Sequence, residues 1–251
     1  MLKLMKYEFR KTWITKLILL GLTAALEVLF LIGLYADKEE TQAISAGLLA
    51  VLAVGGILII GLESVLTLHR DMNTKQSYML FMTPNSSYAI LGAKVLECGI
   101  SILITAAFYF ALGALDITLL FAKSGELSQL WEMIQDFLQH FTINGQPLTI
   151  DLPVMASLAF ELVAGWIGTV TTAYLAVVIS AALLNGKRFN GLLSFLFFLA
   201  LSWLSSWVAR QITAGMADAK TTMIVYGLID LVFAAVMYFV TAQIMERKLS
   251  V

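Results

Sequence analysis

The chain has little charge, one cysteine and two histidines. Of its 251 residues, 13% are charged and 60% are hydrophobic, and the mean hydropathy is +0.87. Soluble globular domains carry about 25% charged residues, so this composition predicts an integral membrane protein. The formal net charge is −1, and it predicts no nucleic-acid partner.

The scarcity of cysteine and histidine narrows the chemistry. Cys98 has no second cysteine to pair with, which excludes an internal disulfide, and its place in an apolar run predicts a buried structural thiol. The predicted topology puts His69 and His140 on opposite sides of the membrane, which argues against a shared metal site. The sequence has no GxxxxGK[ST] phosphate loop and no HExxH motif. By itself the chain is predicted to be neither an enzyme nor a metal or cofactor binder.

Six apolar segments are long enough to be membrane spans, since a helix needs about 20 apolar residues to cross the hydrocarbon core. The predicted spans are 17–35, 42–68, 92–115, 153–184, 190–209 and 222–245. The predicted fold is therefore a single all-α transmembrane domain over residues 1–251. An even number of spans places both termini on the same side.

The basic residues predict which side that is. They cluster before the first span, in the segment 69–94, at Lys187-Arg188 and in the Arg247-Lys248 tail, and the positive-inside rule makes these places cytoplasmic. The opposite side is richer in Asp and Glu. We therefore expect a multi-pass protein of the plasma membrane with both termini in the cytoplasm.

Residues 1–15 are predicted to form an interfacial helix. Their apolar stripe is Leu2, Met5, Phe9 and Trp13, and the basic residues alongside it are Lys3, Lys6 and Arg10. This is the pattern of a basic amphipathic helix lying on a membrane. A simple extension of the first span is the alternative.

The external loop 116–152 is predicted to contain a second amphipathic helix. Its apolar face comprises Leu127, Leu130, Trp131, Ile134, Leu138 and Phe141. Such a helix either anchors at the headgroups and caps the bundle, or forms a lid over an exit path.

The cytoplasmic loop 69–91 changes abruptly from charged to apolar. It opens with Arg70, Asp71 and Lys75, and its apolar run is Tyr78, Met79, Leu80, Phe81 and Met82. Thr83 and Pro84 end any short helix that this run forms. Such a run must be buried against the membrane surface, the chain's own helix ends or another protein.

The chain resembles the membrane subunit of an ABC-type exporter of the type-2 permease class. Three features carry the resemblance: the six spans, the start MLKLMKYEFRKT and the loop RDMNTKQSYMLFMTPNSSYAILGAK. The resemblance implies a dimer of two permeases with two separately encoded ATPases, which hold the ATP and Mg. It also implies that the N-terminal helix meets the ATPase and that a coupling helix after span two docks in it. The docking residues would be 71–84, anchored by Tyr78, Met79, Leu80 and Phe81. One departure is the external helix, which lies between spans three and four, whereas the best-known branches carry it between spans five and six.

Two other functional classes remain open. One is an ATP-independent channel or secondary transporter, which would function without a nucleotide-binding partner. The other is a membrane sensor or immunity protein that binds a ligand without moving it. The transported substrate is not specified by the sequence.

Charges near the cytoplasmic ends of spans two and three are predicted to brace the coupling loop. Lys94 and Glu97 lie one helical turn apart, and Glu63 and Arg70 lie two turns apart on one face. Snorkelling of these side chains to water is the alternative.

Three acids lie within the spans without a basic neighbour in sequence. Glu27, Glu161 and Asp230 each fall eight residues from an external boundary, or roughly 12 Å at 1.5 Å per residue. We hypothesise a polar chamber in the outer half of the bilayer that receives a cationic or amphiphilic substrate, or a proton. Three separately satisfied carboxylic acids are the alternative.

Overall fold

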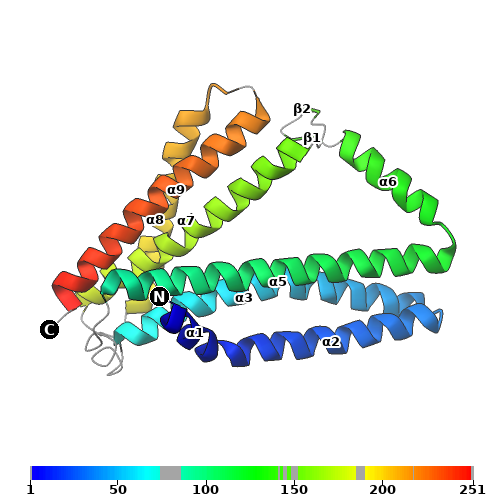
Figure 1. The fold of residues 1–251 in the computed structure, drawn as a ribbon, viewed down its shortest axis with the longest axis horizontal. Helices are drawn as coiled ribbons and strands as arrows, with labels where there is room; N and C mark the ends of the chain where they lie inside the picture. The colour runs from blue at the N-terminus through cyan, green and yellow to red at the C-terminus, as the bar shows by residue number, and fades with distance from the viewer. Residues whose placement is uncertain are drawn as a thin grey trace. The chain divides into compact units, whose positions relative to one another are not determined.

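The computed structural model describes residues 2–73, 86–140, 142–143, 146–147, 152–184, 190–216 and 218–249. These residues are almost entirely helical (Figure 1). The helices are α1 (Leu2–Lys11), α2 (Trp13–Tyr35), α3 (Glu39–Asn73), α5 (Ser87–Ser124), α6 (Leu127–His140), α7 (Leu152–Leu184), α8 (Asn190–Thr213) and α9 (Ala219–Ile244). A π-helical turn, η1 (Met245–Leu249), follows α9, and the two-residue strands β1 (Thr142–Ile143) and β2 (Gln146–Pro147) pair antiparallel.

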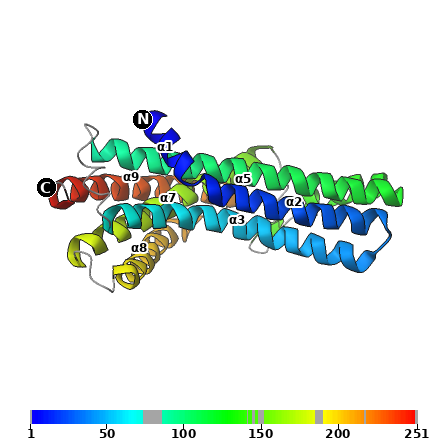
Figure 2. The ribbon, with the colours of Figure 1, turned by 90° about the horizontal axis from the view of Figure 1, so that it is seen from below.

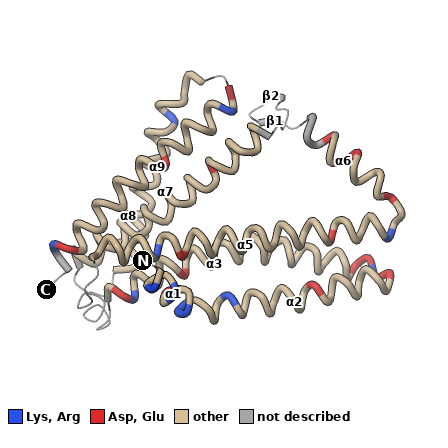
Figure 3. Tube along the Cα trace, in the orientation of Figure 1, with Lys and Arg blue, Asp and Glu red and all other residues tan. Residues whose placement is uncertain are grey.

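Within the described residues, six helices are long and apolar enough to cross a membrane, namely α2, α3, α5, α7, α8 and α9. Their charged residues gather near the helix ends, and few lie in between (Figure 3). The prediction of an all-α, multi-pass membrane protein is therefore confirmed. The helices α1 and α6 occupy the two segments predicted to be interfacial, and their placement on a membrane surface stays a prediction.

Several helices run beyond the predicted spans. Helix α5 has 38 residues, which corresponds to about 57 Å at 1.5 Å per residue, more than a hydrocarbon core of about 30 Å. It continues to Ser124 because the sequence after Asp116 stays apolar as far as Phe121. The first part of the predicted external loop 116–152 is thus helical. The predicted coupling residues Tyr78, Met79, Leu80, Phe81, Met82, Thr83 and Pro84 lie outside the described residues.

The chain divides into two compact units. Unit 1 comprises Met1–Ser64 and Leu96–Trp131, and unit 2 comprises Val65–Val95 and Glu132–Val251. In unit 1, α2, α3 and α5 lie side by side (Figures 1 and 2). A buried cluster of Phe30, Leu34 and Leu49 holds α2 against α3.

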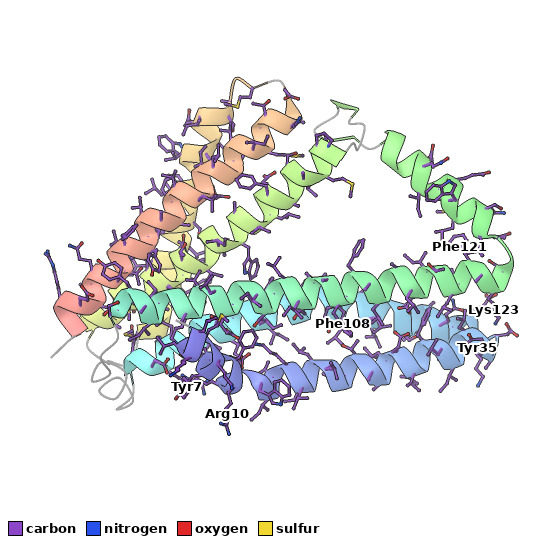
Figure 4. The ribbon with its side chains drawn as sticks, viewed as in Figure 1. Tyr7, Arg10, Tyr35, Phe108, Phe121 and Lys123 are labelled. Carbon is purple, nitrogen blue, oxygen red and sulfur yellow. The ribbon has the colours of Figure 1, made fainter. Side chains whose placement is uncertain are left out.

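The turn between α2 and α3 is tight. Asp37 adopts the left-handed conformation with φ 54°, and Lys123 at the end of α5 reaches the turn, where it pairs with the Asp37 carboxylate and donates to the Leu34 carbonyl (Figure 4). Gly33 permits the close approach of the two helices. A Cβ on Gly33 would lie 2.7 Å from the backbone nitrogen of Gln42 and 2.9 Å from its Cα.

In unit 2, α7 packs against both α8 and α9. A ridge of small residues on α7 is buried in this packing: Ala164, Thr172, Ala176 and Ser180. Small side chains let helix backbones come close together in membranes. Gly227 on α9 marks the closest approach, because a Cβ there would lie 2.6 Å from the Phe160 ring and 3.4 Å from the Glu161 Cα.

Helix α9 begins where Asp218 caps it. The Asp218 carboxylate accepts hydrogen bonds from the hydroxyl and the backbone N–H of Thr221. These bonds favour the charged carboxylate and hold the pKa of Asp218 below its ordinary value. A short polar turn thus separates α8 from α9.

We expect the substitution Gly33→Ala to destabilise the protein. The added methyl group meets backbone atoms that cannot rotate away, and overpacking of this kind costs about 1–3 kcal/mol. Gly47→Ala is the matched control, since a Cβ at Gly47 meets nothing within 4 Å. Thermal unfolding in detergent measures both, and equal melting temperatures for the two variants would contradict the close approach.

Candidate functional site

A pocket of about 970 Å³ lies between α7, α8 and α9 of unit 2. Its lining combines acids, hydroxyls, aromatic rings and apolar side chains. The polar lining residues are Glu161, Thr169, Thr172, Ser202, Ser205, Ser206, Thr213, Thr222, Tyr226 and Asp230. None of the described residues that line it is Lys, Arg or His.

Helical spacing places these residues on common faces. On α9, Thr222, Tyr226, Asp230 and Phe233 follow one another at intervals of four, four and three residues, so they share one face. On α7, Glu161, Gly165 and Gly168 do the same. Periodicity thus places the lining residues of each helix on one face, and the packing of α7 against α8 and α9 brings these faces to the pocket.

The pocket occupies one end of unit 2. Its residues come from positions 158–172 of α7, the second half of α8 and positions 219–233 of α9, next to the turn between α8 and α9. In the predicted topology this turn is external. The pocket then lies in the outer half of the spans.

Glu161 and Asp230 meet where α7 crosses α9. The Asp230 carboxylate packs against two glycines, since a Cβ on Gly165 would lie 3.2 Å from Asp230 Oδ2 and one on Gly168 would lie 3.6 Å from Asp230 Cβ. The two acids are close enough to repel each other when charged. Among the described residues, no side chain donates a hydrogen bond to either carboxyl group.

The third predicted acid, Glu27, belongs to unit 1 and has a different neighbour. Its carboxyl group lies beside that of Asp116 on α5, close enough for the two groups to interact. A hydrogen bond between two carboxyl groups requires a proton on one of them. Glu27 Oε2 and Asp116 Oδ1 are buried without a partner in the described part of the chain, so the pair has no charged counterion there.

A single chamber formed by all three predicted acids stays a prediction, since Glu27 belongs to unit 1 and the other two acids belong to unit 2. Glu161 and Asp230 line one pocket, whereas Glu27 pairs with Asp116. Sequence reasoning missed Asp116 because it took this residue as the start of the external loop. The apolar residues that follow it, from Ile117 to Phe121, were the available signal.

The charged residues predicted to brace the coupling loop interact with residues other than the predicted ones. In unit 2, Lys94 forms an ion pair of 2.8 Å with Asp71 at the end of α3, and both side chains are at most 5% exposed. In unit 1, Glu63 accepts a hydrogen bond of 2.5 Å from Thr15. Asp71, predicted as a docking residue, therefore contributes to the packing of α3 against α5. The bracing role proposed for Arg70 stays a prediction.

Glu97 is the centre of a polar cluster in unit 1. Its Oε1 accepts hydrogen bonds from Lys16 Nζ at 2.7 Å, from Thr12 Oγ1 at 3.0 Å and from Ser101 Oγ at 3.0 Å. The Lys16 ammonium also lies 4.2 Å from the centre of the Phe9 ring. Sequence reasoning missed this cluster, because Thr12 and Lys16 lie more than 80 residues before Glu97.

The cluster ties α1 to the spanning helices. The interfacial helix predicted for residues 1–15 ends at Lys11, and Trp13 begins α2. Lys3, Lys6 and Arg10 are exposed, whereas Phe9 is partly buried. Figure 4 shows Tyr7 and Arg10 on α1. The exposed face of α1 is therefore basic with some apolar and aromatic side chains.

No protein-family model, no curated protein and no solved structure matches this chain. The fold and the site define a class only, a six-span membrane protein with acids inside its helices.

We expect Lys94→Met to destabilise the protein by about 3–5 kcal/mol, because it removes one partner of the buried ion pair with Asp71. The double variant Lys94→Met/Asp71→Leu should recover much of this loss, since it removes both charges. Lys38→Met, which removes an exposed lysine, serves as the control. Unfolding free energies in mixed detergent micelles measure the series, and a double variant no more stable than Lys94→Met would argue against the ion pair.

Proposed function

We propose that the chain is the permease subunit of an ATP-driven exporter in the plasma membrane. The observation that supports this best is the polar pocket inside the membrane-spanning helices α7, α8 and α9. Carboxyl groups within a spanning segment are costly, at about 2.5 kcal/mol or more on insertion scales, and typically serve a transport path. A protein with only a structural role in the bilayer has no need of such a pocket.

The driving force would come from a partner. Two permeases would pair, and each would contact a separate ABC-type ATPase that binds ATP and Mg. The loop 69–91 would dock on the ATPase, and closure of the ATPase pair would switch the permeases between two packings, which gives alternating access.

The Lys16–Glu97 cluster supports a mechanical role for α1. Charge-assisted hydrogen bonds, which are about twice as strong as neutral ones, join α5 to Thr12, which directly follows α1, and to Lys16 at the start of α2. Phe9 of α1 contacts the same Lys16 ammonium through its ring. A displacement of α1 by the ATPase would then reach the spanning helices of unit 1. The exposed basic residues Lys3, Lys6 and Arg10 would face the partner or the headgroups.

The second candidate is an ATP-independent secondary transporter. The specific observation in its favour is the Glu27–Asp116 pair, because a proton held between two carboxyl groups of spanning helices is a potential coupling ion. Such a protein would transport when purified alone, and its transport would follow the proton gradient.

Co-purification decides between the two. The tagged protein is isolated from its native host at native expression, and its partners are identified by mass spectrometry. We expect an ABC-type ATPase in stoichiometric amount. Transport by the purified chain without any ATPase, in proteoliposomes with a proton gradient, would instead support the secondary transporter.

The docking role of the loop is tested by the variants Tyr78→Ala and Phe81→Ala. Truncation of a central aromatic anchor costs about 2 kcal/mol or more at an interface, or roughly a 30-fold weaker affinity. Binding of the ATPase to the permease in nanodiscs measures the effect. The control is Tyr35→Ala, an exposed aromatic residue that the predicted topology puts on the other side of the membrane. Unchanged binding of both loop variants would disprove the docking assignment.

A further inference from the structure

We propose that the pocket between α7, α8 and α9 binds an organic ammonium ion with an apolar body. As a statement about the transported substrate, this inference rests on the proposed function. As a statement about binding it concerns only unit 2, and it can be tested without an ATPase.

The charge of the lining selects a cation. Glu161 and Asp230 reach the pocket from facing helices, and no basic residue is among the described residues that line it. Their mutual repulsion and the low dielectric of the bilayer both oppose two negative charges. A bound cation between them would offset both effects, and an anionic ligand would worsen them.

The hydroxyl groups select a ligand that donates hydrogen bonds. Four lining hydroxyls already donate to carbonyls of their own helices, at distances between 2.8 and 3.0 Å. These are Thr169, Ser205, Thr213 and Thr222. A hydroxyl that donates in this way keeps its oxygen lone pairs as acceptors. The lining is therefore rich in acceptors, which suits the N–H groups of an ammonium ion.

The indole of Trp166 adds no hydrogen-bond donor to the lining of the pocket. Its Nε1 atom is buried and has no hydrogen-bond partner among the described residues, so the pocket contacts the ring and not the N–H group. Tyr226 and Phe233 add two further rings to the lining. Aromatic faces attract cations, most strongly where water is excluded.

The size of the pocket favours a small molecule over a bare inorganic ion. Its volume of about 970 Å³ is at the upper end of the range of about 300–1,000 Å³ for small-molecule sites. Leu158, Leu162 and Met223 provide apolar contacts. The described residues also contain no group of three His, Cys, Asp or Glu side chains that could hold a metal ion. An amphiphilic amine matches both parts of the lining.

The test uses desipramine, a tricyclic secondary amine that is protonated at neutral pH. Its binding to the purified full chain in nanodiscs of neutral lipid is measured by isothermal titration calorimetry, with empty nanodiscs subtracted. We expect saturable binding. Glu161→Gln and Asp230→Asn should each weaken it about tenfold or more, since each removes a charge-assisted hydrogen bond. Glu40→Gln removes an equal charge from an exposed position at the start of α3 and should leave binding unchanged.

Two further measurements sharpen the test. The anion 8-anilinonaphthalene-1-sulfonate should not compete with the amine, and Ser202→Phe, which fills the pocket without removing a charge, should abolish binding. Size-exclusion profiles and melting temperatures show whether each variant is folded. Equal affinity in wild type and in the folded double variant Glu161→Gln/Asp230→Asn would overturn the proposal, as would competition by the anion. The ATPase co-purification is a separate experiment, so either conclusion can fail while the other stands.

Discussion

This structure depends on one constraint, the free-energy cost of placing a carboxyl group inside membrane-spanning helices. Water does not satisfy such a group in the hydrocarbon core, so it needs a cation, a proton or a polar cavity. Each solution occurs here. Glu97 has Lys16 and two hydroxyls, Glu27 has Asp116, and Glu161 with Asp230 has a pocket. The way in which each carboxyl group is satisfied therefore distinguishes structural acids from candidate functional ones.

The two kinds of acid differ in what they offer to a ligand. Glu97 accepts three hydrogen bonds through one oxygen and is 4% exposed, so its bonding capacity is largely used inside unit 1. Glu161 and Asp230 accept none from the described residues, and they line open space. Gly165 contributes to this arrangement, because a Cβ there would lie 3.2 Å from Asp230 Oδ2, whereas a Cβ on Gly168 would make an ordinary contact with Asp230. The glycine that allows α7 and α9 to approach therefore also shapes the pocket.

Hydropathy was sufficient to predict the six spanning helices and the interruption between the fifth and the sixth. Helix ends were less accurate, as α5 shows by continuing past residue 115 to Ser124. The sequence was enough to predict how far Glu27, Glu161 and Asp230 lie from the ends of their spans, since each residue of an α-helix advances a fixed distance along the helix axis. Their partners were not, because depth says nothing about the rotation of a helix about its axis or about which helix lies beside it.

The sequence by itself determined that this is an all-α membrane protein, where its polar residues interrupt the spans and which faces of α7 and α9 carry acids. These properties follow from local chemistry, namely hydropathy and a period of 3.6 residues per turn. Only the tertiary structure decided that Lys94 pairs with Asp71, that Lys16 reaches Glu97, and that Glu161 and Asp230 share a pocket. Helix pairing is set by the fit of whole surfaces, small ridges and glycines included, and residues distant in sequence become neighbours only through that fit.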